Sequence, residues 1–498
     1  MTLPIPEPPA RRLRPVRPVH TAVIVVAALA VGLLATQQLT LAVLAGVGLL
    51  ALTFFVQVGQ RLPAYAMALV GISLAGYAFL GRGYAYFGVP PLFIGELTMI
   101  LGVLGAGMAL WQGTRLRHTW GLAALVVVFI LVGLRSTVPH YSQYHLDAIR
   151  DAATWYYSLF ALIVAVLVVQ QGRLKWAIDR YGTLIPYLLV FGPIALWTTN
   201  LVHSKIPTWP TSGGEILYVK AGDLAVHLAG MMGFLLLGLA RVRVSAPSVI
   251  QSVLSRRHEW WWWTVWLLGT AGLISSRASL LSIIAALACI LAFRPLARWG
   301  KLLFVAAAIF SLLVVINPRY ETRSGRELSI DGLMIALESV AGGTGDTAVD
   351  GTRTWRLNWW HKIEGYTLHG DYFWTGKGYG VNLANSDGFQ VHADQSLRNP
   401  HSIHFSILGR SGVPGLASWI VLNGAFAFSL FLAFVRARRQ GQIMWANVHL
   451  WLLSYWLAFI VNASFDVYIE GPQGGIWFWS VMGFGIAALE LYRRGEEL

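Results

Sequence analysis

The sequence predicts an all-α polytopic integral membrane protein with one large extracytoplasmic loop. Of its 498 residues, 56% are hydrophobic and 12% are charged, and the mean hydropathy is +0.59. Soluble domains are typically about 25% charged. The chain is therefore expected to bury most of its apolar surface in a lipid bilayer.

Apolar segments long enough to cross a membrane recur along the chain. A hydrocarbon core about 30 Å thick needs roughly 20 helical residues. On this basis we expect about 14 transmembrane helices, near 20–36, 39–57, 62–80, 92–111, 119–135, 152–170, 183–200, 221–240, 260–276, 278–294, 301–316, 413–435, 444–463 and 473–491. The expected division is a basic tail (1–19), helices 1–11 (20–316), a large loop (317–404), helices 12–14 (405–491) and a tail (492–498).

The distribution of charge predicts the orientation. One set of alternate loops holds 22 of the 37 Lys and Arg residues, and cytoplasmic loops carry such an excess. Both termini are then cytoplasmic, and the large loop is extracytoplasmic. The basic character is explained by topology, so no nucleic-acid partner is expected. A single cysteine, Cys289, excludes a disulfide framework and cysteine-based metal centres.

The loop at 317–404 is far longer than an ordinary connection and is rich in aromatic residues, which solvated linkers lack. Its segment 353–364, "RTWRLNWWHKIE", predicts a helix with two faces. One face carries Trp355, Trp359 and Lys362, and the other carries Arg353, Arg356 and Trp360. A helix lying on the bilayer surface is the alternative interpretation.

The segment "NPHSIHFSILG" predicts a helix start, with Asn399 as N-cap, Pro400 at the first helical position and Gly409 as a stop. His401 would fall in the first turn, where the helix dipole favours a neutral imidazole. His404 follows on nearly the same face. A His-x-x-His pair can bind metal, but the carboxylate of the zinc-protease pattern is missing, so no metal is expected.

The segment "TGKGYG" resembles a phosphate-binding loop only superficially. Its glycine spacing is wrong for a P-loop, and Gly378 stands where Ser or Thr is required. We expect these glycines to form tight turns or to allow a close backbone approach.

Ionisable residues at the ends of membrane spans indicate functional sites, because their burial is costly. Four groups stand out: Asp147, Arg150 and Asp151; Lys220, Asp223 and His227; Arg277; and Arg410. Arg150 and Lys220 could instead pair with the adjacent aspartates, and His227 could be an ordinary core histidine. Arg277 has no acid nearby in sequence.

Cations near one membrane boundary, without a metal motif, favour an anionic substrate. Arginine binds phosphate oxygens bidentately and keeps its charge when partly desolvated. A lipid-linked sugar diphosphate fits this site, because diphosphate leaves readily once neutralised and one general base then suffices. No cofactor is required.

An ordered set of short motifs resembles the O-antigen ligase/polymerase superfamily of the bacterial envelope. These motifs are Ser276-Arg277, Arg353 with Trp355, "GKGYG" at 376–380, His401, and "GRSGVPGL" at 409–416. The resemblance implies a GT-C-like, metal-independent glycosyltransferase in the bacterial inner membrane that uses an undecaprenyl-diphosphate-linked donor. It also implies that His401 and Arg277 are essential, and a further essential arginine is assigned by position to Arg150, with Lys220 as second choice.

The expected function is an inverting glycan transfer on the periplasmic face. His401 is the expected base, and the diphosphate is expected to contact Arg277, Arg150 and Lys220. The other expected substrate-binding residues are Arg353, Arg356, His404 and Arg410. The acceptor is a glycan or glycolipid: lipid A core for a ligase, or another repeat unit for a polymerase, which could work with a chain-length regulator. The alternatives are a transporter or lipid-linked glycan flippase, and a peptidoglycan polymerase of the shape and division type.

Overall fold

The computed structural model describes residues 39–239, 266, 269, 277–294, 320–321, 327–328 and 347–498. The chain divides into two compact units, Met1–Pro63 and Ala64–Leu498. The second unit contains every site residue considered below. The expected spans at 20–36 and 301–316, and most of the one at 260–276, lie outside the described residues.

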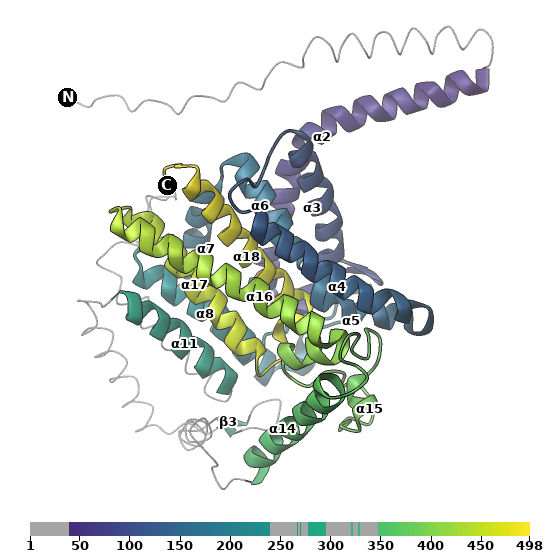
Figure 1. The fold of residues 1–498 in the computed structure, drawn as a ribbon, viewed down its shortest axis with the longest axis vertical. Coiled ribbons are helices and arrows are strands. Elements are labelled where there is room, and N and C mark those ends of the chain that lie inside the picture. The colour runs from purple at the N-terminus through teal and green to yellow at the C-terminus, as the bar shows by residue number, and fades with distance from the viewer. Residues whose placement is uncertain are drawn as a thin grey trace. The chain divides into compact units, whose positions relative to one another are not determined.

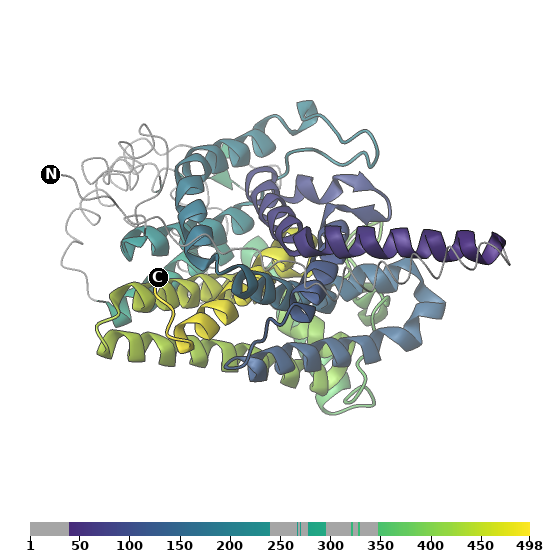
Figure 2. The ribbon, with the colours of Figure 1, turned by 90° about the horizontal axis from the view of Figure 1, so that it is seen from above.

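Helices dominate the described part of the chain (Figures 1 and 2). They are α2 (Leu39–Leu80), α3 (Ile94–Trp111), α4 (Trp120–Tyr144), α5 (Leu146–Tyr156), α6 (Leu159–Gln171), α7 (Leu174–Leu201), α8 (Ala221–Leu236), α11 (Arg277–Phe293), α14 (Thr347–Leu368), α15 (Leu383–Asp387), α16 (Ile403–Arg439), α17 (Ile443–Ala463) and α18 (Pro472–Arg493). Short 3₁₀ turns lie at η1 (Arg82–Tyr86), η2 (His203–Lys205) and η5 (Tyr468–Glu470). Two antiparallel hairpins pair β1 (Gly88–Val89) with β2 (Leu92–Phe93) and β3 (Tyr320–Glu321) with β4 (Glu327–Leu328).

The prediction of a helical membrane protein is confirmed. Among the described residues, 7 helices are long and apolar enough to cross a bilayer, or up to 8 if the bent pair of α5 and α6 forms one span. Helices α8 and α11 are shorter and apolar. The expected number of about 14 spans is not established by these residues. The segments expected as separate spans at 39–57 and 62–80 form one continuous helix, α2, which includes Pro63.

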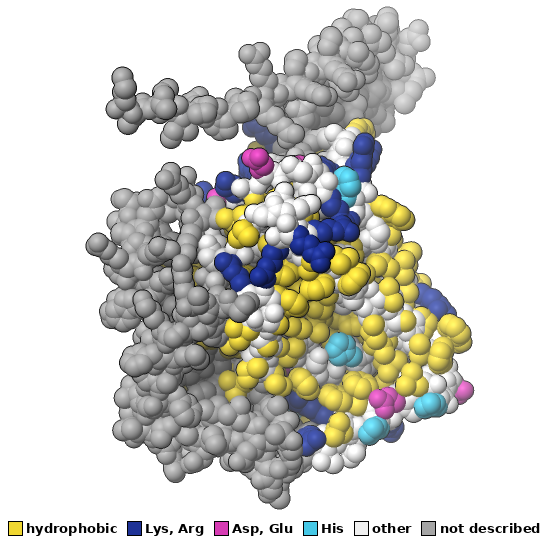
Figure 3. All heavy atoms as spheres, turned by 60° about the vertical axis from the view of Figure 1, so that its left-hand side comes forward, with side chains coloured by type: hydrophobic (Ala, Val, Ile, Leu, Met, Phe, Trp, Pro, Cys, Tyr) yellow, Lys and Arg dark blue, Asp and Glu magenta, His cyan; other side chains and the backbone are white. Residues whose placement is uncertain are grey.

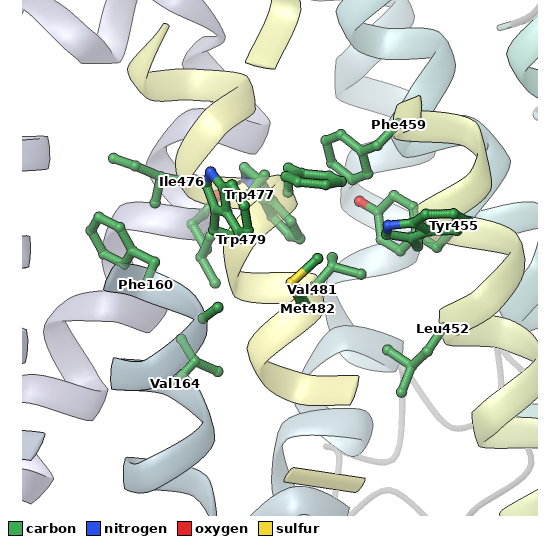
Figure 4. Close-up of a cluster of buried hydrophobic side chains, with 14 of the residues drawn as sticks. Phe160, Val164, Leu452, Tyr455, Phe459, Ile476, Trp477, Trp479, Val481 and Met482 are labelled. Atoms are coloured by element: carbon green, nitrogen blue, oxygen red, sulfur yellow. Dashed lines mark hydrogen bonds between the residues drawn. The ribbon is translucent and has the colours of Figure 1, made fainter. Parts of the chain in front are cut away.

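The apolar core is formed where α18 packs between α6 and α17. Figure 4 shows Phe160 and Val164 of α6, Trp477 of α18 and Tyr455 of α17 in this layer. Gly483 lets α18 approach α6 closely, because a Cβ there would lie 2.7 Å from the Ala161 carbonyl oxygen. Small residues permit such close helix contacts in membranes, where dispersion contacts replace the hydrophobic effect.

Helix α14 contains the predicted helix at 353–364, and both of its predicted faces are used in packing. Trp359 is fully buried and donates a hydrogen bond to Asp387 at 2.7 Å. On the other face, Trp360 stacks on Phe405 of α16, with ring centroids 4.7 Å apart. The aromatic residues are therefore explained by packing of α14 against α15 and α16.

Loops expected to be cytoplasmic meet at one end of α18. The Glu490 carboxylate accepts hydrogen bonds from the backbone N–H groups of residues 117–119, and Tyr492 donates to Gln440 at 2.9 Å. Figure 3 shows a patch of Lys and Arg above a broad hydrophobic band. This clustering agrees with the alternation of loops, and the side of the membrane stays a prediction.

Candidate active site at the start of helix α16

His401 lies immediately before α16 in a strained backbone conformation. Its φ is 55°, in the left-handed region, which costs a non-glycine residue about 1–3 kcal/mol unless surrounding contacts hold it. The expected helix start is wrong, because α16 begins at Ile403 with Ser402 as N-cap. The helix also continues through the expected stop at Gly409 to a break at Gly412.

Tertiary hydrogen bonds hold this segment in place of a local helix cap. Asn399 donates to one carboxylate oxygen of Glu470 at 3.1 Å, and Ser406 donates to the other at 2.7 Å. The Pro400 carbonyl accepts from the Trp360 indole at 2.9 Å. These bonds flank His401 on both sides and explain why its strained backbone persists. Burial raises the pKa of Glu470 to about 7, although hydrogen bonding from Ser406 and the Arg410 charge oppose this rise.

A cavity of about 350 Å³ opens beside His401. It is lined by Gly351, Trp355, Arg356, Val391, His392, Leu397 and His401. The Trp355 and His401 rings have centroids 6.3 Å apart. The cavity thus combines an aromatic wall, a guanidinium and an imidazole.

The His401 imidazole is neutral at pH 7. Burial, followed by the positive charge of Arg356, lowers its pKa to about 4, while Asp466 acts in the opposite direction. The neutral form agrees with the prediction, but its cause differs. The expected helix-dipole effect does not apply, because His401 lies outside the helix.

Asp466 lies in the connection between α17 and α18, near enough to His401 for the two groups to influence each other electrostatically. Burial by itself raises the pKa of Asp466, but Arg82, Lys220 and the backbone N–H of Val467 lower it below its ordinary value. The Val467 N–H donates to its carboxylate at 2.7 Å. Asp466 is therefore an anion placed among cations and close enough to His401 to influence its proton affinity.

Arg82 pairs with Asp223, which changes the expected role of Lys220. The Arg82 guanidinium contacts both Asp223 carboxylate oxygens, at 2.7 and 3.1 Å. The alternative pairing of Lys220 with Asp223 is not observed. Lys220 is the N-cap residue of α8 and contributes positive charge near Asp466 and His401.

Arg277 is the first residue of α11, and only its backbone is described. Two residues later, Ser279 is fully buried and faces Gly222 of α8, whose added Cβ would lie 4.0 Å from the Ser279 hydroxyl and 3.3 Å from an Asp466 carboxylate oxygen. The start of α11 thus lies in the neighbourhood of Asp466 and Lys220.

Arg150 and Arg410 belong to a second cluster, built around Asp151. Arg410 is 2% exposed and contacts Asp151 at 3.0 Å, while Arg398 contacts both Asp151 carboxylate oxygens, at 3.1 and 2.8 Å. Arg150 is 55% exposed and lies 3.2 Å from Asp147 and 3.5 Å from Asp151. The ion-pair alternative for Arg150 is thus observed, and the Arg410 guanidinium is occupied by protein groups.

The Asp151 cluster supports the segment that carries His401. Arg410 donates to the carbonyls of Val381 and Arg398, at 2.9 and 3.2 Å. Arg398 is three residues before His401, so this network holds the approach to the site.

The glycine-rich segment 376–380 provides a close backbone approach, as predicted. Gly376, Gly378 and Gly380 have φ values of 61°, 84° and 104°. A Cβ at Gly378 would overlap the His140 ring of α4, and one at Gly376 would overlap the Arg410 backbone. The turn thereby fits between α4 and α16.

Two of the histidines have their ring nitrogens occupied by protein groups. His404 accepts from the Trp419 indole at 3.1 Å and donates to the Ser464 hydroxyl at 3.0 Å. His227 lies between the hydroxyls of Tyr455 and Tyr468, at 2.8 and 3.0 Å, which confirms the core-histidine interpretation. The described part of the chain contains no group of three or more His, Cys, Asp or Glu residues that could hold a metal ion.

The structure thus brings Arg356, Lys220 and the start of α11 near His401, while Arg353 is exposed on α14. Sequence reasoning missed Arg82 and Asp466, as well as Arg398 and Glu470. Arg82 and Asp466 directly follow the expected spans at 62–80 and 444–463, so the same search for ionisable residues at span ends could have found them.

These features define a helical membrane protein whose site combines a neutral imidazole, an adjacent carboxylate and several cations. A family model described as O-antigen ligase matches residues 262–420. This match confirms the resemblance to the O-antigen ligase/polymerase family and supports a membrane glycan-processing function. No curated protein matches the chain.

Proposed function

We propose that the protein is a metal-independent inverting glycosyltransferase of the bacterial inner membrane. It transfers a glycan from undecaprenyl diphosphate to a glycan or glycolipid acceptor on the extracytoplasmic face. The observation that carries this proposal is a neutral His401 that lines a cavity together with Arg356. The charges of Lys220 and Asp466 also influence this histidine.

In the proposed reaction, the His401 imidazole takes the proton of an acceptor hydroxyl. The acceptor oxygen forms a bond to the anomeric carbon from the face opposite the diphosphate. The bond from that carbon to the diphosphate oxygen breaks, and its electron pair leaves with the diphosphate, so the configuration inverts. His401 then returns its proton to solvent.

Cations stabilise the charge that develops on the leaving diphosphate. Arg356 and Lys220 are candidates for this role because both influence His401 electrostatically. Arg277 is a third candidate, because its backbone lies at the start of α11, in the same neighbourhood. Arginine keeps its charge in a partly dry site and binds phosphate oxygens bidentately, and lysine binds phosphate as a point charge. A bound donor also adds negative charge, which raises the pKa of His401 toward the operating pH and makes it a better base.

Asp466 complements the base. Once His401 has accepted a proton, the nearby carboxylate stabilises the imidazolium, which is consistent with its effect of raising the pKa of His401. The positive charge of Arg356 acts in the opposite direction. The proton affinity of His401 therefore depends on two opposing charges, those of Asp466 and Arg356.

The alternative of a transporter would need Lys220, Asp223 and His227 to line a substrate path. Two of these three side chains are instead bound to other protein groups. Asp223 is paired with Arg82, and both His227 nitrogens contact tyrosine hydroxyls. These contacts favour a fixed site over a substrate path. The acceptor remains either lipid A core or another repeat unit, and polymerisation would add a chain-length regulator as a partner.

The test is a transfer assay in proteoliposomes with a lipid-linked glycan donor. His401→Ala should reduce transfer by about 10²- to 10⁴-fold, the usual contribution of a general base. His361→Ala is the matched control, because His361 is exposed and pairs with Glu364 on α14. A chelator should leave the wild-type rate unchanged. Full transfer by His401→Ala, or loss of transfer with chelator, would overturn the proposal.

A further inference from the structure

The connection between α17 and α18 (residues 464–471) contacts the segment that carries His401, although it lies outside the region matched by the family model. Ser464 contacts His404 at 3.0 Å, and the Phe465 carbonyl accepts from Arg356 at 2.9 Å. The Asp466 carboxylate influences the proton affinity of His401. One short connection therefore contacts Arg356 of the cavity lining and His404 of α16, and its carboxylate influences His401 electrostatically.

Glu470 ends this connection and binds the His401 segment at two points. Its carboxylate oxygens accept from Asn399 at 3.1 Å and from Ser406 at 2.7 Å. Asn399 is two residues before His401, and Ser406 is five residues after it. Both hydrogen bonds end on the same carboxylate, so Glu470 joins the two sides of the segment.

The backbone under Glu470 is itself well anchored. The turn η5 places Tyr468 and Ile469 in the core, each 2% exposed. The Tyr468 hydroxyl contacts His227, and the Tyr468 carbonyl lies against Gly474 at the start of α18. The Glu470 carboxylate thus extends from a buried turn toward the strained segment at His401.

We propose that Glu470 is a positioning residue for His401, which it acts on through Asn399 and Ser406. A left-handed φ at His401 persists only where contacts on both sides enforce it, and these two bonds provide such contacts. The inference rests on the proposed function, since it assigns Glu470 to the same transfer reaction. Charged or ionisable groups that influence this carboxylate are Arg410 of α16, Asp151 of α5 and Tyr379 of the glycine turn.

The substitutions Glu470→Ala and Glu470→Gln separate positioning from charge. Alanine removes both acceptors, so kcat should fall by about tenfold or more while the donor KM changes little, because small misplacements of a base slow the reaction strongly. A glutamine amide can accept from Asn399 and donate to the Ser406 hydroxyl. Glu470→Gln should therefore keep kcat within about threefold of the wild type. Equal losses in both variants would overturn the proposal.

A double-mutant cycle tests the route through Asn399. If Glu470 acts through this residue, Asn399→Ala and Glu470→Ala should be non-additive, and the double variant should be little slower than Glu470→Ala alone. Multiplying losses would overturn this route. Glu490→Ala is the matched control for general destabilisation, because Glu490 is a buried carboxylate at the opposite end of α18.

A second readout does not depend on transfer. The rate at which diethyl pyrocarbonate modifies His401 can be followed by peptide mass spectrometry in the full-length protein. Release of the segment in Glu470→Ala should raise this rate severalfold, with Glu470→Gln and Glu490→Ala near the wild type. An unchanged rate in Glu470→Ala would refute positioning even if transfer is observed. A raised rate without any wild-type transfer would refute the glycosyltransferase proposal and leave the positioning role standing.

Discussion

Replacement of Arg410 by leucine distinguishes a structural role from a direct substrate contact. The guanidinium is 2% exposed and contacts Asp151 at 3.0 Å, and it also donates to the carbonyls of Val381 and Arg398. Breaking a buried ion pair typically costs about 3–5 kcal/mol. Here Asp151 keeps its two contacts with Arg398, so a loss near the lower limit, about 3 kcal/mol, is expected in the free energy of unfolding.

The assay is thermal unfolding of purified protein in detergent, followed by tryptophan fluorescence, together with transfer kinetics. Arg410→Leu should lower the midpoint by several degrees and reduce kcat, because the segment leading to His401 loses support. Arg61→Leu, at an exposed arginine, should leave the midpoint unchanged. If Arg410→Leu is as stable as the wild type and raises only the donor KM, Arg410 contacts the substrate directly and the structural argument is wrong.

The other predictions concern the proton affinity of His401 and the glycine turn. The pKa of His401 is lowered to about 4, so the base form and transfer should be lost as pH falls through that value, as measured by kcat/KM against pH. Arg356→Gln removes a charge that lowers this pKa and should move the acid limb to higher pH, whereas Asp466→Asn should move it to lower pH. Shifts in the same direction would contradict the assigned charges. Gly378→Ala should destabilise the protein by more than the roughly 1–3 kcal/mol that a left-handed φ of 84° costs by itself, because the Cβ would also overlap a histidine ring of α4. Gly213→Ala has a similar φ but open space, so an equal loss there would show that backbone strain alone is responsible.

Residue chemistry suggests which side chains to consider for the candidate site, but it does not show which groups these side chains contact. The motif predicts His401 as the base, which stays a prediction, and its neutral form is expected from the helix dipole, whereas in the structure burial and Arg356 lower its pKa. The sequence suggests Arg150, by its position, and Arg410, at a span end, as substrate contacts, whereas the structure places both beside Asp151. Local spacing could suggest the pair of Arg150 with Asp147, but it could not show that Arg398, 247 residues from Asp151, completes the cluster.

The membrane class, most described helices and the need for glycine at 376–380 follow from the sequence itself, because hydrophobic length and backbone freedom are local properties. The tertiary structure determines which charged and polar side chains contact one another. Arg82 reaches Asp223 across 141 residues, and Glu470 reaches Asn399 across 71. Such pairs form only when helix packing brings distant segments together, so the electrostatics of His401 depend on the tertiary structure.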